Sequence, residues 1–175
     1  AAITTQPVAS QTLCTGNAAS FSIVATGTTL TYQWLVDGNP IPSANSATFN
    51  IASLASGDAG TYTCEVVAVC GLFVTSSNSV LTVNSGAAIT TQPTATQTLC
   101  VGGSATFSVV ATGTSLTYQW KKGGSPLSNG GRIAGATSAS LSVSSIISGD
   151  ADTYTCDVTA SGCGTAITSS NAVLI

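Results

Sequence analysis

Apolar and polar residues alternate with a period of two along several short segments of the chain. One such face carries Phe21, Ile23 and Ala25, and a later segment places Tyr32 and Trp34 in the same way. Alternation of this kind, rich in β-branched and aromatic residues, is typical of half-buried β-strands. Gly, Asn, Asp and Pro separate the segments at short intervals, and no helical periodicity is sustained. The pattern therefore predicts an all-β sandwich or barrel.

The whole pattern occurs twice. Ala1–Cys14 reads AAITTQPVASQTLC and Ala87–Cys100 reads AAITTQPTATQTLC, so the second copy starts at residue 87 where the first starts at residue 1. Solenoid repeats are shorter, about 20–50 residues, whereas this period fits a small domain copied in tandem. We expect domain 1 over residues 1–84 and domain 2 over residues 87–175.

The join between the copies, Val83–Ala87, has few residues and a loose composition. A connector this short restricts the swing of one domain against the other. The second copy stops at Leu174-Ile175 where the first continues through Leu81-Thr82-Val83, which leads us to expect a natural chain that continues.

Composition argues against catalysis and against several classes of partner. Charged residues make up 5% of the chain, against roughly 25% in ordinary globular proteins. Histidine, the commonest general base and metal ligand, is absent. The three basic residues form no stripe for nucleic acid, and no apolar run reaches the length of about 18 residues that spans a bilayer. We expect no catalytic or cofactor-binding residues, no nucleic-acid partner and no membrane insertion.

Two further features bear on metals and on compartment. Asp150 and Asp152 share a strand face, but calcium prefers six or more oxygen ligands, and the first copy has Gly60 in place of Asp152. We therefore expect no metal site. Six cysteines, three in each copy, favour an oxidising compartment.

The most specific motif places a tryptophan upstream of an aspartate, a tyrosine and a cysteine with fixed spacing. The two copies read Trp34…Asp58-x-Gly60-x-Tyr62-x-Cys64 and Trp120…Asp150-x-Asp152-x-Tyr154-x-Cys156. This motif resembles the immunoglobulin fold of the intermediate or variable type, over essentially the whole chain. The resemblance implies that each tryptophan is buried on strand C and that each tyrosine forms a corner at the start of strand F. It implies two tandem immunoglobulin-like antiparallel β-sandwiches joined by a short linker, with each aspartate stabilising its corner.

The copies depart from the immunoglobulin pattern in their cysteines. The strand B position that usually carries a cysteine is Ile23 in the first copy and Val109 in the second. We therefore expect Cys64 and Cys156 to be buried free thiols that behave as small apolar side chains.

The other cysteines, with Thr-Gln-Pro openings and Cys-Gly hairpins, resemble those of tandem immunoglobulin-like repeats in large bacterial surface and secreted proteins. That resemblance places Cys14 and Cys100 before the A′–B turn, and Cys70 and Cys163 in the F–G hairpin. These two ends of one domain lie roughly 25–30 Å apart, so it implies an inter-domain disulfide between Cys14 and Cys163. Cys70 and Cys100 are then half-cystines for neighbouring repeats, and six free or differently paired thiols remain the alternative.

The second copy also carries an insertion. The interval Trp120–Ser148 is six residues longer than Trp34–Ser56, and the extra residues fall within Lys121–Ala139. They bring Arg132, which is placed to form a salt bridge with Asp150 as in variable-type domains. We expect Lys121 and Lys122 to lie in a solvated turn, and Glu65 and Asp157 to point outward from strand F.

These features predict a structural repeat segment of an extracellular protein on the bacterial cell surface. It would act as a rigid stalk or filament unit stapled by inter-domain disulfides, and its partners would be neighbouring immunoglobulin-like repeats or identical chains in an array. The alternative is an adhesin-type module that recognises a glycan or a protein through loops at one end. Because aromatic anchors dominate recognition, Phe73 near the F–G hairpin is the main candidate for that role.

Overall fold

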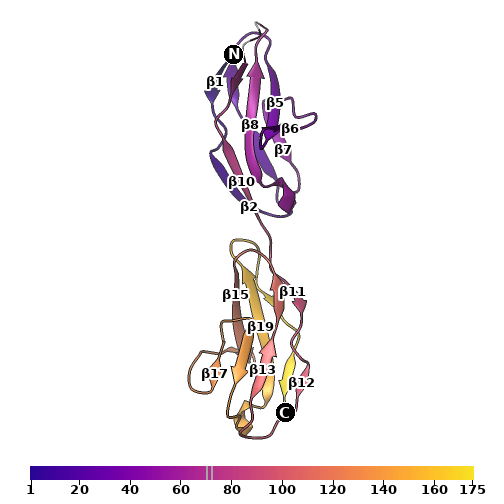
Figure 1. Cartoon of the computed structure of the whole chain (residues 1–175), viewed down its shortest axis with the longest axis vertical. Coiled ribbons are helices and arrows are strands. Elements are labelled where there is room, and N and C mark those ends of the chain that lie inside the picture. Colours follow the sequence, from indigo (N-terminus) through magenta and orange to yellow (C-terminus); the bar gives the residue numbers. More distant parts are fainter. Residues whose placement is uncertain (70, 72) are drawn as a thin grey trace. The chain divides into compact units, whose positions relative to one another are not determined.

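The computed structural model of the chain describes residues 1–69, 71 and 73–175 and contains two compact units, Ala1–Asn84 and Ser85–Ile175 (Figure 1). We call them unit 1 and unit 2 and describe each by itself. Their described residues form β-strands and two short 3₁₀ turns. The predicted all-β class is therefore confirmed.

Unit 1 is a sandwich of antiparallel strands with one parallel pair. Its main sheet has the order β2-β10-β8-β5-β6, with β9 also paired to β8, and two further pairs, β1-β4 and β3-β7, form the opposite face. The parallel pair is β10 with β2. The strands and the 3₁₀ turn are β1 (Ala2–Thr5), β2 (Ser10–Cys14), β3 (Ala19–Ser22), β4 (Val24–Thr26), β5 (Thr31–Val36), β6 (Asn39–Pro40), β7 (Thr48–Ile51), η1 (Ser56–Asp58), β8 (Gly60–Val67), β9 (Phe73–Thr75) and β10 (Ser79–Asn84).

Unit 2 repeats this topology with one strand more. Its main sheet has the order β12-β21-β19-β15-β16, with β20 beside β19, and the opposite face holds β11-β14 and the three-stranded β13-β18-β17. The elements are β11 (Ala88–Thr91), β12 (Thr96–Gln97), β13 (Ala105–Ser108), β14 (Val110–Thr112), β15 (Leu116–Lys122), β16 (Ser125–Pro126), β17 (Ile133–Ala134), β18 (Ser140–Val143), η2 (Ser148–Asp150), β19 (Asp152–Ala160), β20 (Ile167–Thr168) and β21 (Ala172–Leu174).

The centre of each core is a tryptophan beside a cysteine. Trp34 of β5 lies directly opposite Cys64 of β8, and Trp120 of β15 lies directly opposite Cys156 of β19. All four side chains are fully buried. Directly opposite residues of antiparallel strands share a face, so each indole packs beside a thiol on the inner face of the main sheet.

The facing sheet completes each core with aliphatic and aromatic side chains. Ile23 and Phe21 belong to the same buried cluster as Cys64, and Val109 and Phe107 to that of Cys156. Ile23 lies where the chain passes from β3, which pairs with β7, to β4, which pairs with β1. Apolar packing rather than a disulfide therefore joins the two sheets.

The chain between the units is more tightly held than its composition suggested. Strand β10 runs through Asn84, whose carbonyl accepts a 2.8 Å hydrogen bond from the Thr15 amide. The Ser85 amide donates to the Thr114 hydroxyl at 2.9 Å, and the Ser85 carbonyl accepts from the Thr114 amide at 3.0 Å. Asn84 and Ser85 are therefore each hydrogen-bonded within their own unit, despite the loose composition of the join.

The insertion of unit 2 builds an additional edge. In unit 1 the Ile41 amide donates to the Trp34 carbonyl, and the Trp34 amide donates to the Ala44 carbonyl. Unit 2 has the same two bonds, from Leu127 to Trp120 and from Trp120 to Ala136. The extra residues therefore lie between Leu127 and Ala136, where β17 adds to β18. The lysine pair expected in a turn instead ends strand β15, and the turn that follows consists of two glycines with φ of 52° and 82°.

We predict that Trp34→Ala or Trp120→Ala destabilises its unit by about 3–5 kcal/mol, because truncation removes packing and leaves a cavity. Urea unfolding followed by circular dichroism measures the effect. Val24→Ala and Val110→Ala are matched controls at exposed positions of the two units, where we expect changes within about 0.5 kcal/mol. A loss of under about 1 kcal/mol for either tryptophan variant would contradict this account of the core.

Candidate functional site

Polar groups with defined partners concentrate at the turn between β7 and β8 and at its counterpart between β18 and β19. The Tyr62 hydroxyl donates to the Asp58 carbonyl at 2.7 Å, and the Tyr154 hydroxyl donates to the Asp150 carbonyl at 2.8 Å. Each aspartate also closes its 3₁₀ turn, because its carboxylate accepts a backbone amide three residues upstream, at 2.8 Å in unit 1 and 2.9 Å in unit 2. Both corners therefore hold the start of the central strand.

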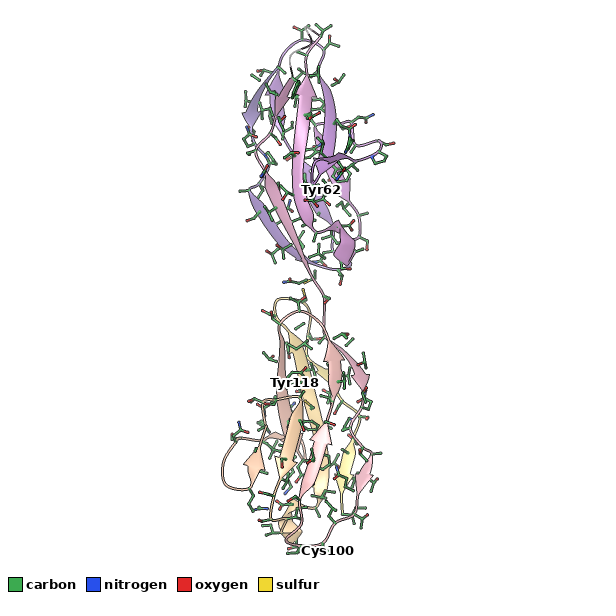
Figure 2. The ribbon with its side chains drawn as sticks, viewed as in Figure 1. Tyr62, Cys100 and Tyr118 are labelled. Carbon is green, nitrogen blue, oxygen red and sulfur yellow. The ribbon has the colours of Figure 1, made fainter. Side chains whose placement is uncertain are left out.

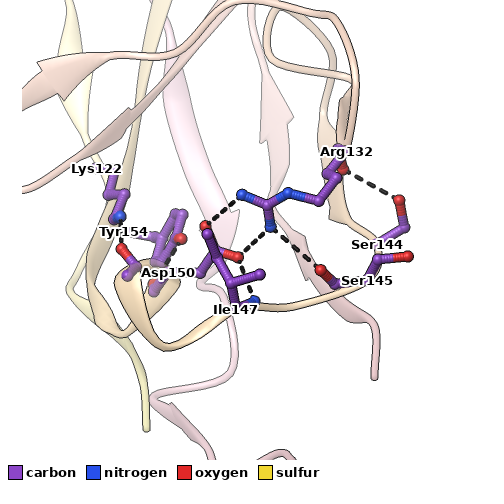
Figure 3. Close-up of polar contacts among 8 residues, drawn as sticks. Lys122, Arg132, Ser144, Ser145, Ile147, Asp150 and Tyr154 are labelled. Atoms are coloured by element: carbon purple, nitrogen blue, oxygen red, sulfur yellow. Dashed lines mark hydrogen bonds and ion pairs between the residues drawn. The ribbon is translucent and has the colours of Figure 1, made fainter. Parts of the chain in front are cut away.

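Unit 2 adds an ion pair to its corner (Figure 3). The Arg132 guanidinium donates to both carboxylate oxygens of Asp150, one of the bonds being 3.2 Å long. This pair confirms the bridge expected from the insertion. Hydrogen bonding from Arg132 lowers the pKa of Asp150 against the opposing effect of burial, and the amide of Ile147 assists. The ionised carboxylate is thus the form that the folded unit favours.

The lysines of β15 bind neighbouring strands and turns. Lys121 pairs with Asp157 at 2.5 Å, and Lys122 donates to the Gly149 carbonyl. Burial acts to raise the pKa of Asp157, but hydrogen bonds from Lys121 and Thr168 outweigh it, so the net direction is downward. The expectation that the two lysines lie in a solvated turn was therefore wrong, whereas Asp157 does lie on the face of β19 opposite the buried Cys156.

The cysteines fall into different states. Cys64 and Cys156 are free and buried, and their burial raises the pKa of each thiol to about 11. Cys14 and Cys163 are disulfide-bonded. Cys100 is free and exposed (Figure 2). Cys70, expected to be a half-cystine, lies outside the described residues.

The end loops of unit 1 expose apolar side chains. Phe73 is 64% exposed and Val69 is 69% exposed, on either side of the turn between β8 and β9. The other aromatic rings of unit 1 are buried or pack against its core. Phe73 therefore lies where a partner can reach it.

Among the residues that the structure describes, no pocket forms and no group of three or more His, Cys, Asp or Glu side chains is placed to hold a metal ion. In the same part of the chain, no helix is long and apolar enough to cross a membrane.

Residues 88–159 match the immunoglobulin domain family. A three-domain I-band fragment of titin superposes on 98% of the chain with a TM-score of 0.76 at 19% identity, and the match covers 64% of that fragment. Both units have an immunoglobulin-like fold. Domains 1–4 of Sidekick-1 give the same TM-score at 18% identity, over 99% of this chain and 48% of that one. At these identities the likeness establishes the fold alone.

A curated relative shares sequence with part of this immunoglobulin-like chain. It is a decoration protein of Escherichia phage T5, 38% identical over 88 residues, which are 49% of this chain and 49% of the relative. The chain thus spans about half the length of the curated relative that it matches.

The pair of Lys121 with Asp157 was missed because it depends on strand register. Lys121 lies opposite Thr155 and Gln119 opposite Asp157, so the two charges are diagonal neighbours across β15 and β19. Diagonal pairs of this kind bring long side chains into reach. The sequence places both residues near strands of the main sheet. It does not show which residues of the two strands lie opposite each other, so the pair could not be predicted.

We predict that Arg132→Met lowers the stability of unit 2 at pH 7, because the substitution removes the guanidinium that pairs with the buried Asp150 carboxylate. The folded pKa of Asp150 is depressed, so the stabilisation is present above the unfolded pKa of about 3.9 and is lost as pH falls through the folded value. The difference from wild type should therefore vanish in acid. Urea unfolding from pH 7 to pH 2 measures it, with Arg132→Lys as the control that keeps the charge without the bidentate fork.

We also predict that the buried thiols destabilise both units in alkali. Their folded pKa of about 11 exceeds the ordinary thiol value of 9.0, so stability is intact below pH 9 and falls as pH rises to 11, by about 2–3 kcal/mol per thiol. A Cys100→Ala background limits disulfide exchange. In that background, Cys64→Ala/Cys156→Ala should flatten the dependence of the urea midpoint between pH 9 and pH 11. Equal slopes for the two proteins would contradict the prediction.

Proposed function

We propose that the chain is a structural repeat segment, a pair of immunoglobulin-like domains stapled together by a disulfide between Cys14 and Cys163. The pair acts as a stiff spacer that holds other parts of a longer protein away from an outer surface, with neighbouring repeats or identical chains as partners. Its chemistry is mechanical rather than catalytic.

The observation that carries the proposal is the position of the two bonded cysteines. One lies near the residue where the chain leaves unit 1, and the other lies near the residues where the chain enters unit 2. Cys14 ends β2 and pairs with Asn84, the last residue of unit 1. In unit 2, a Cβ on Gly86 would lie 3.5 Å from the Cys163 carbonyl oxygen. Asn84 and Gly86 are two positions apart, which favours a bond between these cysteines over any pairing within one unit.

A staple across this join would restrict bending, because Asn84 and Ser85 are already bonded inside their units. A covalent link between residues 14 and 163 closes a second connection beside the main chain. Two covalent connections between the units would leave less freedom of bending than the main chain alone.

We place the protein outside the cytoplasm, on the surface of a bacterial cell or of a phage particle. Disulfides persist in oxidising surroundings. The partial relative from phage T5, a decoration protein, and the resemblance to tandem bacterial surface repeats support this location.

An adhesin-type role, in which end loops bind a glycan or a protein, is the second candidate. The exposed Phe73 and Val69 favour it, since aromatic side chains serve as anchors in recognition. Glycan-array and pull-down screens of wild type against Phe73→Ala test this role. A ligand lost with that substitution would support it.

We predict that Cys14→Ser or Cys163→Ser increases independent motion of the two units. ¹⁵N relaxation should show shorter rotational correlation times for the variants than for oxidised wild type, with Cys100→Ser unchanged. By the chain-entropy model, loss of so long a loop also costs up to about 5 kcal/mol, less any native strain. Peptide mapping under non-reducing conditions identifies the pairing directly, and a bond from Cys14 to any other cysteine would overturn the staple.

A further inference from the structure

Strand β7 of unit 1 has an open edge that its counterpart in unit 2 does not have. β7 pairs with β3, and among the residues that the structure describes no strand pairs with its other edge. In unit 2 the matching strand, β18, carries β17 on that edge. The match is set by register, because Ala19 lies opposite Ile51 in unit 1 and Ala105 lies opposite Val143 in unit 2. Unit 2 therefore shows what this edge accepts, which is one more antiparallel strand.

The open edge of β7 presents the backbone groups of alternate residues. The Ala47 carbonyl accepts the Ile23 amide at 3.0 Å, so Ala47 and every second residue after it along β7 turn their N–H and C=O groups toward β3. Thr48 and Asn50 turn theirs away from β3, and both residues are exposed. Backbone groups at an unpaired strand edge are a template on which another strand can pair.

The inner face of β7 is also less covered than that of β18. Phe49 and Ile51 are half-buried, whereas Leu141 and Val143, in the matching positions, have 0% exposure. Strand β17 contributes to this difference, because its Ile133 lies opposite Val143 and packs against the core cluster of unit 2. The edge of unit 1 thus lacks an apolar side chain as well as a strand.

The sequence along this edge does little to discourage pairing. Sheet edges are commonly protected by charged residues, proline or short length. Residues 43–57 contain no Asp, Glu, Lys, Arg or Pro, so two such edges meet without repulsion between like charges. Strand β7 is four residues long, which limits the contact area, and we expect a weak association.

We propose that β7 docks β7 of a second copy of this chain, antiparallel and about a two-fold axis at Asn50. The β3-β7 pairs of the two copies then join into one four-stranded sheet. A two-fold interface is self-complementary, so one strand supplies both of its sides. The inference rests on the proposed function, in which identical chains are partners, but it needs no disulfide.

The register of this pairing follows from that of β17. In unit 2 Ile133 lies opposite Val143, which matches Ile51 of unit 1. With Asn50 opposite Asn50 of the second copy, Phe49 of one copy lies opposite Ile51 of the other and takes the place of Ile133. The two Asn50 residues exchange backbone hydrogen bonds, and each Phe49–Ile51 pair has the closer spacing of about 4.5 Å between Cα atoms. Each copy thus supplies the apolar side chain that the other lacks.

Sedimentation equilibrium of the purified, oxidised chain from about 10 μM to about 1 mM tests the association. We expect a monomer–dimer equilibrium, with the concentration-dependent ¹⁵N shifts concentrated on β7 and its neighbours. Asn50→Lys places two like charges directly opposite each other and should raise the Kd at least about fivefold.

Ser20→Lys is the matched control. Ser20 is exposed and lies opposite Asn50 on β3, so it shares the outer face of the same sheet. Across the dimer its two copies are three strand spacings apart, about 14 Å, which exceeds the Debye length of about 10 Å at 0.1 M salt. We expect its Kd to stay within about twofold of wild type, and circular dichroism checks that both variants fold.

A third variant tests the register. The two Cα atoms at position 50 of the dimer are expected about 5.5 Å apart, within the range of a disulfide. In a Cys100→Ala background and a glutathione redox buffer, Asn50→Cys should therefore link two chains through the introduced thiols. The link should form at least about tenfold faster than that of Ser20→Cys.

A monomer at every concentration, a Kd unchanged by Asn50→Lys, shifts confined to other strands, or equal linking rates for the two cysteine variants would overturn the inference. Non-reducing peptide maps of the same samples report the partner of Cys14, so the two hypotheses fail separately. A stapled chain that stays monomeric refutes only the docking. A dimer through β7 with Cys14 in another pairing refutes only the staple.

Discussion

The structure of each domain depends on burying one tryptophan at the centre of a sandwich whose sheets share no disulfide. Trp34 and Trp120 have 0% exposure, so each indole N–H must find a partner away from water. Each donates to a backbone carbonyl 2.9 Å away, that of Ser46 or Ser138. This bond fixes the loop that covers the core, and in unit 2 it persists although the insertion lengthens the chain between donor and acceptor. Because packing and not a redox bond joins the sheets, the domains are free to use their other cysteines elsewhere.

The corner that precedes β8 in unit 1 and β19 in unit 2 is the second constraint, and the two domains support it differently. The Asp58 carboxylate accepts a hydrogen bond from the Ala55 amide. Asp150 is 6% exposed, and its carboxylate also pairs with the Arg132 guanidinium. A carboxylate buried that far needs a charged partner more than a hydrated one does. The insertion that adds β17 also delivers that partner, since Arg132 directly precedes the strand. The same insertion therefore adds both the extra strand and the charged partner of Asp150.

Contacts close in sequence were predictable, and those set by strand register were not. The tyrosine corner joins residues four positions apart, and the resemblance of the Asp-x-x-x-Tyr motif to immunoglobulin domains implies it. The buried tryptophans follow from alternation on one strand. By contrast, the pairing of Cys14 with Asn84 in a parallel ladder joins distant positions, and only that ladder reveals that the join is bonded rather than loose. Ser85 looked like linker by composition, yet the Thr114 hydroxyl that holds it lies on a turn of unit 2.

The two copies agree at the positions that build the core and differ at exposed positions of the turns and hairpins. Tryptophan, tyrosine, aspartate and cysteine keep their places in both cores, while Val101 replaces Thr15 and Phe73 stands against Ala166 at the ends. With charged residues at 5% of the chain, long-range electrostatics selects neither partner nor register. Selection then falls to short-range packing and to the geometry of sulfur pairs, which bond only when their Cα atoms come within about 7 Å.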